Sequence, residues 1–112
     1  MSESKLRDLS VDFSVKVVKL CESIKGHYSL VNQLERSATS IGANIHEAKY
    51  AHGTADFVAK LQISLKECYE TEYWIELLLE SGYYSDNGVL DKCVEVKKIP
   101  ISSVNRAKSK QS

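Results

Sequence analysis

The stretch Phe57–Leu78, FVAKLQISLKECYETEYWIELL, decides the fold because its apolar and small residues recur at alternating spacings of four and three. The recurring positions are Phe57, Leu61, Ser64, Cys68, Thr71, Ile75 and Leu78. A repeat of about 3.5 residues keeps one helix face toward its partners over many turns, as in left-handed bundles. The stretch therefore predicts a long helix packed along one seam.

Glycine-centred breaks divide the rest of the chain into further helices. One proline in 112 residues and almost no strict alternation argue against strands. We expect helices over about residues 5–25, 29–51, 54–81 and 86–99, the first with an apolar stripe of Leu6, Leu9, Phe13, Val17, Leu20 and Ile24. Short connections force consecutive helices to lie antiparallel, so residues 1–105 are predicted to be one all-α, up-down-up-down four-helix bundle.

The fourth predicted helix meets an obstacle at Pro100. Proline removes an amide donor and clashes with the preceding turn, which costs about 3 kcal/mol inside a helix. We therefore expect this helix to kink near Val96 or to end by Ile99, although Ile101 and Val104 could pack beyond a kink. Residues 106–112, rich in Lys, Arg and Ser, are predicted to be a mobile basic tail.

Composition narrows the class of protein. A hydrophobic content of 43% and a charged content of 27% are typical of a globular domain. No apolar run approaches the roughly 20 residues that span a membrane, and residues 1–10 lack a signal-peptide core, so we expect a cytoplasmic protein. The three cysteines are far apart in helical patterns and are predicted to be buried and reduced.

Charge is unevenly distributed although the net charge is zero. Residues 53–82 carry two basic and six acidic side chains, a net charge of −4, and residues 83–112 carry six basic and three acidic ones, a net charge of +3. The basic set is a candidate nucleic-acid surface and comprises Lys92, Lys97, Lys98, Arg106, Lys108 and Lys110. The absence of an overall positive excess weakens that hypothesis.

Motifs for catalysis and metal binding are missing from the sequence. No Glu-x-x-His pair of the kind that holds di-iron sites occurs, and no glycine-rich phosphate loop or nucleophile elbow is present. We therefore predict no catalytic residues, no metal ligands and no cofactor, and we expect a protein that is not an enzyme.

Polar residues interrupt the second predicted helix in the stretch Glu35–Ala48, ERSATSIGANIHEA. On a helical projection Ser37 and Asn44 lie beside the apolar seam of Ile41 and Ile45, with the remaining polar residues further round. One hypothesis is a shoulder that bonds to a neighbouring helix or subunit and specifies helix register. The alternative is a binding cleft lined by Arg36, Asn44 and Glu47.

Two helices carry apolar residues away from their seams. Val11, Val15 and Val18 lie opposite Phe13 on the first helix, and Ile63, Trp74 and Leu77 lie off the seam of the third. Because a single bundle needs only one stripe per helix, these six residues are a predicted surface for self-association.

The polar stretch and the third helix together resemble a known family. LERSATSIGANIHEA is similar to the signature R-S-x-x-S-I-x-x-N-I-x-E of the 23S rRNA intervening-sequence protein family, and FVAKLQISLKECYETEYWIELLLESGY resembles its third helix. The resemblance spans roughly residues 5–99. Its polar stripe corresponds here to Arg36, Ser37, Ser40, Asn44, Glu47, Glu67, Glu70 and Thr71.

The resemblance implies a bundle that assembles into a homo-oligomeric ring, a homopentamer, with a binding or scaffold role of unsettled biochemistry. The family also includes the accessory variability protein of diversity-generating retroelements, a basic pentamer that binds nucleic acid and partners a reverse transcriptase. The alternative function is therefore a nucleic-acid-binding accessory protein, and the predicted partners are further copies of this chain, RNA or DNA, or another protein.

Overall fold

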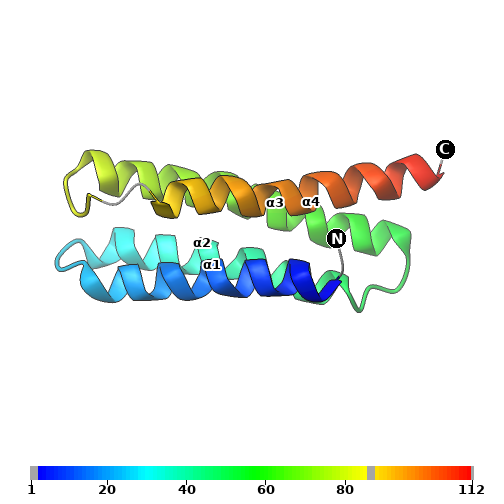
Figure 1. Ribbon diagram of the computed structural model, residues 1–112, viewed down its shortest axis with the longest axis horizontal. Coiled ribbons are helices and arrows are strands. Elements are labelled where there is room, and N and C mark those ends of the chain that lie inside the picture. The colour runs from blue at the N-terminus through cyan, green and yellow to red at the C-terminus, as the bar shows by residue number, and fades with distance from the viewer. Residues whose placement is uncertain (1–2, 86–87, 112) are drawn as a thin grey trace.

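The described residues form four helices, and Figure 1 shows them in two layers, α1 beside α2 and α3 beside α4. The computed structural model describes residues 3–85 and 88–111, without the side chains of residues 3–6 and 111. The helices span Glu3–Ser23 (α1), Tyr28–Ala48 (α2), Thr54–Glu80 (α3) and Gly88–Gln111 (α4). The described residues contain no strand, which confirms the all-α prediction, and none of their helices has the length and hydropathy needed to cross a membrane.

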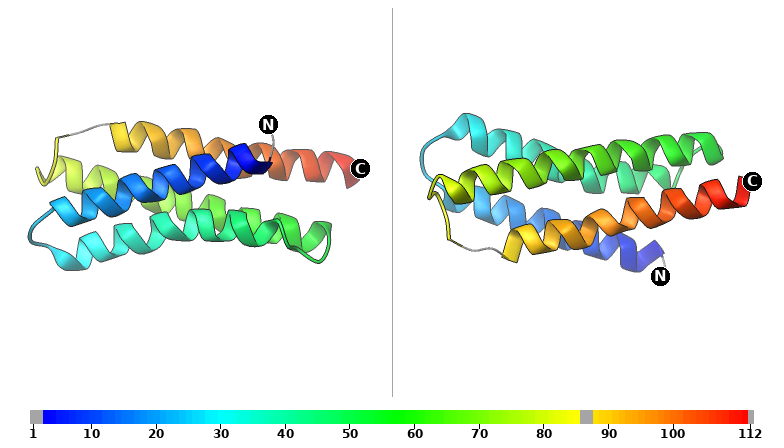
Figure 2. Two further views of the ribbon diagram at one scale, coloured as in Figure 1. Left: turned by 60° about the horizontal axis from the view of Figure 1, so that its bottom comes forward. Right: turned by 90° about the horizontal axis from the view of Figure 1, so that it is seen from above.

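Consecutive helices run in opposite directions, as Figures 1 and 2 show. Helix α2 packs on α1 and α3, and α4 packs on α3 and α1, so α1 and α3 occupy diagonal corners of the bundle. The start of α1, the end of α4 and the α2–α3 connection lie at one end of the molecule, while the end of α1, the start of α2, the end of α3 and the start of α4 lie at the other. The molecule is 48 Å long, close to the roughly 40 Å expected for the 27 residues of α3.

The core follows the predicted stripes. On α3 the seam residues from Leu61 to Leu78 are buried, as predicted, and Phe57 is half-buried at the end of the seam. On α1 the stripe is buried at Phe13 and Val17, and Ile24 is buried just after the helix ends. The predicted core position Leu6 lies outside the described side chains. The three cysteines are buried and unpaired, as expected.

Glycine ends α3 at the predicted position. Gly82 has a φ of 81°, the left-handed conformation that glycine adopts without a Cβ clash. The amide of Tyr83 donates to the carbonyl of Leu78 over 3.1 Å, which is the Schellman bond that closes a helix C-terminus. Beyond it the hydroxyl of Tyr84 donates to the carbonyl of Ile75 over 3.2 Å, so the turn folds back on the helix that it ends.

Helix α4 continues through Pro100 to Gln111, and the prediction that it ends by Ile99 is wrong. The predicted start at Asp86 lies outside the described residues. The residues of the predicted mobile tail belong to this helix as far as Gln111, and their mobility stays a prediction; Ser112 is outside the described residues.

Burial on both sides of Pro100 explains why the helix persists. Ile99 and Pro100 are buried, and Val104 packs in a second apolar cluster with Ala48 and Leu61. Burying an aliphatic side chain contributes about 1.5–3 kcal/mol, so two such residues offset the roughly 3 kcal/mol that proline costs.

Replacing Val104 tests whether α4 packs beyond Pro100. Val104→Ala should lower the free energy of unfolding by about 2 kcal/mol, because it deletes buried carbon atoms and leaves a cavity. The exposed neighbour Asn105 provides the control, and Asn105→Ala should change stability by under about 0.5 kcal/mol. Urea denaturation followed by circular dichroism measures both. Equal effects of the two variants would show that the end of α4 is not packed.

Candidate functional site

The predicted polar shoulder of α2 faces α3, and its centre is a buried pair of hydroxyl groups. Thr71 on α3 donates to Ser37 on α2 over 2.9 Å, and Ser37 donates to the Leu34 carbonyl over 3.3 Å. The Thr71 hydroxyl also lies 2.7 Å from the Glu67 carbonyl oxygen. Both side chains are fully buried. Because a buried hydroxyl without a partner costs about 1–3 kcal/mol, this contact favours one alignment of the two helices.

A second buried hydroxyl joins the same two helices nearer the α2 C-terminus. Ser64 is fully buried on α3 and donates to the carbonyl of Ile41 on α2 over 3.0 Å. Serine and threonine are small enough to let the helices approach while their hydroxyls reach across. The Ser37–Thr71 and Ile41–Ser64 contacts lie about one turn apart on α2 and about two turns apart on α3, and together they fix the register of the two helices.

An ion-pair cluster covers the outer edge of this interface. Arg36 on α2 pairs with Glu70 and, over 3.4 Å, with Glu67, both on α3. The indole Nε1 of Trp74 donates to Glu70 over 2.9 Å, so that carboxylate joins the cation to the aromatic ring. The Arg36 side chain is 49% exposed, and solvent screening limits the contribution of such pairs to stability. The cluster therefore adds little stability to an interface whose register is set by the buried hydroxyls.

The remaining polar residues of the stripe make either an exposed ion pair or hydrogen bonds within α2. Glu47 is exposed and pairs with Lys60 on α3 over 3.5 Å. Ser40 donates to the Arg36 carbonyl over 2.7 Å. Asn44 donates from Nδ2 to the Ser40 carbonyl over 2.8 Å, which is a bond within α2. A bond from Asn44 to a neighbouring subunit stays a prediction.

The register explains the position of Asn44. The antiparallel contacts of Ser37 with Thr71 and of Glu47 with Lys60 place Asn44 level with Ile63 and Ser64. Ile63 offers no polar group, and the Ser64 hydroxyl already bonds to Ile41. The amide group therefore turns back to its own helix.

The alternative of a binding cleft gains no support from the geometry. None of Arg36, Asn44 and Glu47 lines either of the two grooves described below. The three residues lie along the outer side of a closed helix interface, where Arg36 and Glu47 already pair with α3. The stripe is accordingly a packing feature of the bundle.

A shallow apolar groove lies between α1 and α2 and contains the three predicted valines. Val11 and Val15 are 43% and 45% exposed, and Val18 is half-buried. The groove measures about 460 Å³, and the small residues Gly42 and Ala43 line its α2 side. An apolar groove open to solvent is a candidate docking surface.

The predicted off-seam face of α3 is less uniform. Ile63 is 44% exposed, whereas Trp74 and Leu77 are half-buried. Trp74 packs against the core cluster and donates to Glu70, so much of its surface is already used inside the chain. Its participation in an interface stays a prediction.

The candidate nucleic-acid residues do not form one surface. Lys97 pairs with Glu72 on α3 over 2.6 Å and lies 5.0 Å from the centre of the Tyr69 ring, and the hydrogen bond to Glu72 raises the pKa of its amino group. Lys92 pairs with Glu95 over 3.3 Å. The other four residues of the set are exposed. Because successive residues of a helix are rotated by about 100°, their side chains point to several sides of α4. Lys97 is therefore a helix-packing residue, and nucleic-acid contacts by the rest stay a prediction.

The buried thiols lack the features of nucleophiles. Burial, reinforced by nearby Glu35, raises the pKa of Cys21 to about 11, and burial with Glu72 raises the pKa of Cys68 to about 12. The pKa of Cys93 rises for the same reason. A raised pKa keeps a thiol protonated and unreactive at neutral pH. Across the residues described, no three His, Cys, Asp or Glu side chains are grouped as a metal site would require.

Comparison with known proteins places the chain in a family. The family model described as 23S rRNA-intervening sequence protein matches residues 2–102. The chain belongs to the 23S rRNA-intervening sequence protein family. A similar solved structure is that of a protein of unknown function from the S23 ribosomal protein family of Bacteroides thetaiotaomicron, with 39% identity and a TM-score of 0.82 over 88% of this chain and 97% of that one. The comparison with curated proteins found no significant match.

Sequence reasoning missed several residues that the structure brings together in this family member. Ser64 was assigned to the seam without its bond to the Ile41 carbonyl, because periodicity gives a face and not a partner. The Glu72–Lys97 pair joins residues 25 positions apart on α3 and α4, and their opposite charge was the available signal. Arg7 and Lys49, which line an end groove described below, were missed because only the topology places them together.

A double-mutant cycle tests the buried hydroxyl pair of this family member. Ser37→Ala and Thr71→Val each remove one hydroxyl, and their effects on unfolding free energy should couple by about 1 kcal/mol because they share one hydrogen bond. Urea denaturation of the two single variants and the double variant gives the coupling. Thr39→Val is the control, since Thr39 is exposed and bonds within α2; combined with Thr71→Val it should be additive. A coupling near zero for Ser37 and Thr71 would contradict the account.

Proposed function

We propose that this chain is a cytoplasmic, non-enzymatic scaffold or binding protein that works as a homo-oligomeric ring, a pentamer. Membership of the 23S rRNA-intervening sequence protein family supports the proposal through the assembly that the resemblance implies. The single observation that carries it is the exposed valine groove between α1 and α2, since Val11 and Val15 remain more than two-fifths exposed in the folded chain.

The positions of the apolar faces favour a ring over a simple dimer. The valine groove lies on α1 and α2, while the face that contains Ile63 and Leu77 lies on α3, the helix diagonal to α1. A two-fold dimer needs only one self-complementary patch, whereas a ring needs two different patches that meet head to tail. Two unlike faces on one chain supply this requirement.

The interior of the bundle also agrees with a scaffold role. The polar groups of the family motif are used to hold α2 against α3, and the thiols are buried. The surfaces that remain for function are therefore the groove, the α3 face and the end of the bundle. Binding through such surfaces is the role that we assign.

The ring is tested by size-exclusion chromatography coupled to light scattering. The wild-type chain at tens of micromolar should give about five times its mass of 12.6 kDa. Val15→Glu should lower that mass while helical circular dichroism is retained, because a charge buried in an apolar interface is costly.

Val94→Glu is the matched control, since Val94 is 39% exposed on α4 and lies outside both proposed faces. It should leave the assembly intact. A wild-type monomer at tens of micromolar would refute the ring. Equal loss of mass in the two variants would refute the assignment of the valine groove to the interface.

A further inference from the structure

A larger groove opens at the end of the bundle where α1 starts, α4 ends and α2 connects to α3 (Figure 1). It measures about 880 Å³ and is lined by residues of all four helices. That volume falls in the roughly 300–1,000 Å³ range typical of small-molecule sites. The groove forms because the main core cluster ends near Ile99, leaving only the smaller cluster of Ala48, Leu61 and Val104 beyond it.

The floor of the groove is apolar. Ile45 and Phe57 are half-buried and Val11 is exposed, so each presents carbon atoms to the opening, while Leu61 and Ile99 are buried beneath. Ser10 also lines the groove, and its hydroxyl donates a hydrogen bond to the carbonyl of Arg7 over 2.9 Å. Such a floor suits an aliphatic chain better than a nucleobase, which needs polar groups at its edges.

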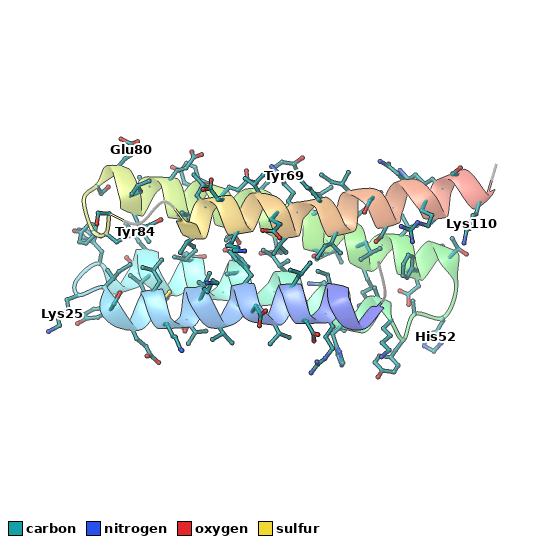
Figure 3. All side chains as sticks on the ribbon, in the orientation of Figure 1. Lys25, His52, Tyr69, Glu80, Tyr84 and Lys110 are labelled. Atoms are coloured by element: carbon teal, nitrogen blue, oxygen red, sulfur yellow. The ribbon has the colours of Figure 1, made fainter. Side chains whose placement is uncertain are left out.

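The rim of the groove is basic. Arg7 from α1, Lys49 beside the end of α2, and Arg106 and Lys110 from α4 line it, together with His46. Figure 3 labels Lys110 at this end of the molecule. None of the described lining residues is Asp or Glu, although the whole chain has as many acidic as basic side chains. The helix topology therefore gathers positive charge from separate segments around one apolar opening.

We propose that this groove binds a single-chain amphipathic anion of the fatty-acid class. The aliphatic tail lies on the floor between Ile45 and Phe57, and the carboxylate meets Arg106 and Lys110 at the rim. The tail is stabilised by burial of apolar surface and the head by Coulomb attraction. Arg7 at the same rim already pairs with Asp8 over 3.5 Å, whereas Arg106 and Lys110 have no ion-pair partner among the described residues. Val11 and Gly42 also line the valine groove, so the assembled protein is the form to test.

Isothermal titration calorimetry on the full chain in its native assembly tests the proposal. Dodecanoate, kept below its micelle concentration, should bind saturably with one site per chain. Acetate lacks the tail and dodecanol lacks the charge, and each should bind at least tenfold more weakly. Phe57→Ala should weaken dodecanoate binding severalfold without changing the salt dependence.

Two double variants on α4 distinguish the effect of the rim residues on binding from the effect of surface charge in general. Arg106→Gln with Lys110→Gln should weaken dodecanoate binding about fivefold, since each partly exposed contact contributes modestly. Lys92→Gln with Lys98→Gln removes the same charge from exposed positions outside the groove and should leave binding unchanged. Circular dichroism and light scattering confirm that each pair keeps the helices and the mass of the wild type. Absence of dodecanoate binding, equal binding of dodecanol or acetate, or equal weakening by both pairs would overturn the proposal.

Discussion

Three buried hydroxyl groups, those of Ser37, Ser64 and Thr71, hold α2 against α3. Their side chains are small, so the two helices approach closely, and each hydroxyl finds a partner on the facing helix. A slip of one turn would break both cross-helix contacts and leave polar groups buried without partners, at about 1–3 kcal/mol each. Close approach and polar satisfaction therefore act together to select one register.

The outer contacts of the bundle depend on that register. Arg36 reaches Glu67 and Glu70 only because Ser37 is aligned with Thr71 one position away, and Glu47 meets Lys60 further along. Helix α4 then packs on the other side of α3, where Lys97 pairs with Glu72. Because α1 closes the bundle against α2 and α4, its Val11 and Val15 are left outside the core. The surfaces to which we assign function are thus the parts of the molecule that these interior contacts leave exposed.

Local pattern was sufficient to predict the fold where periodicity and glycine breaks agreed. The α3 seam from Leu61 to Leu78 and the end of α3 before Gly82 follow directly from spacing. Prediction failed at Pro100, because a local cost was weighed without the burial of Ile99 and Val104 that offsets it.

The candidate site was less predictable from sequence. Asn44 illustrates this, because its partner depends on which residues of α3 lie level with it, namely Ile63 and Ser64. Its amide bonds instead to the Ser40 carbonyl on its own helix. The basic end groove escaped prediction for a related reason: Arg7, Lys49 and Arg106 belong to separate segments, and only the antiparallel topology brings them to one end.

Native-state hydrogen exchange tests the central claim, that the α2–α3 interface is the part on which the rest of the bundle depends. Amides of residues 37–41 and 64–71 should exchange only through global unfolding, with the same free energy as urea denaturation gives. Amides of α1 and of α4 beyond Pro100 should exchange through smaller openings. If the α2–α3 amides instead exchanged at a lower free energy than those of α1, the hydroxyl contacts would not be the constraint that organises this fold.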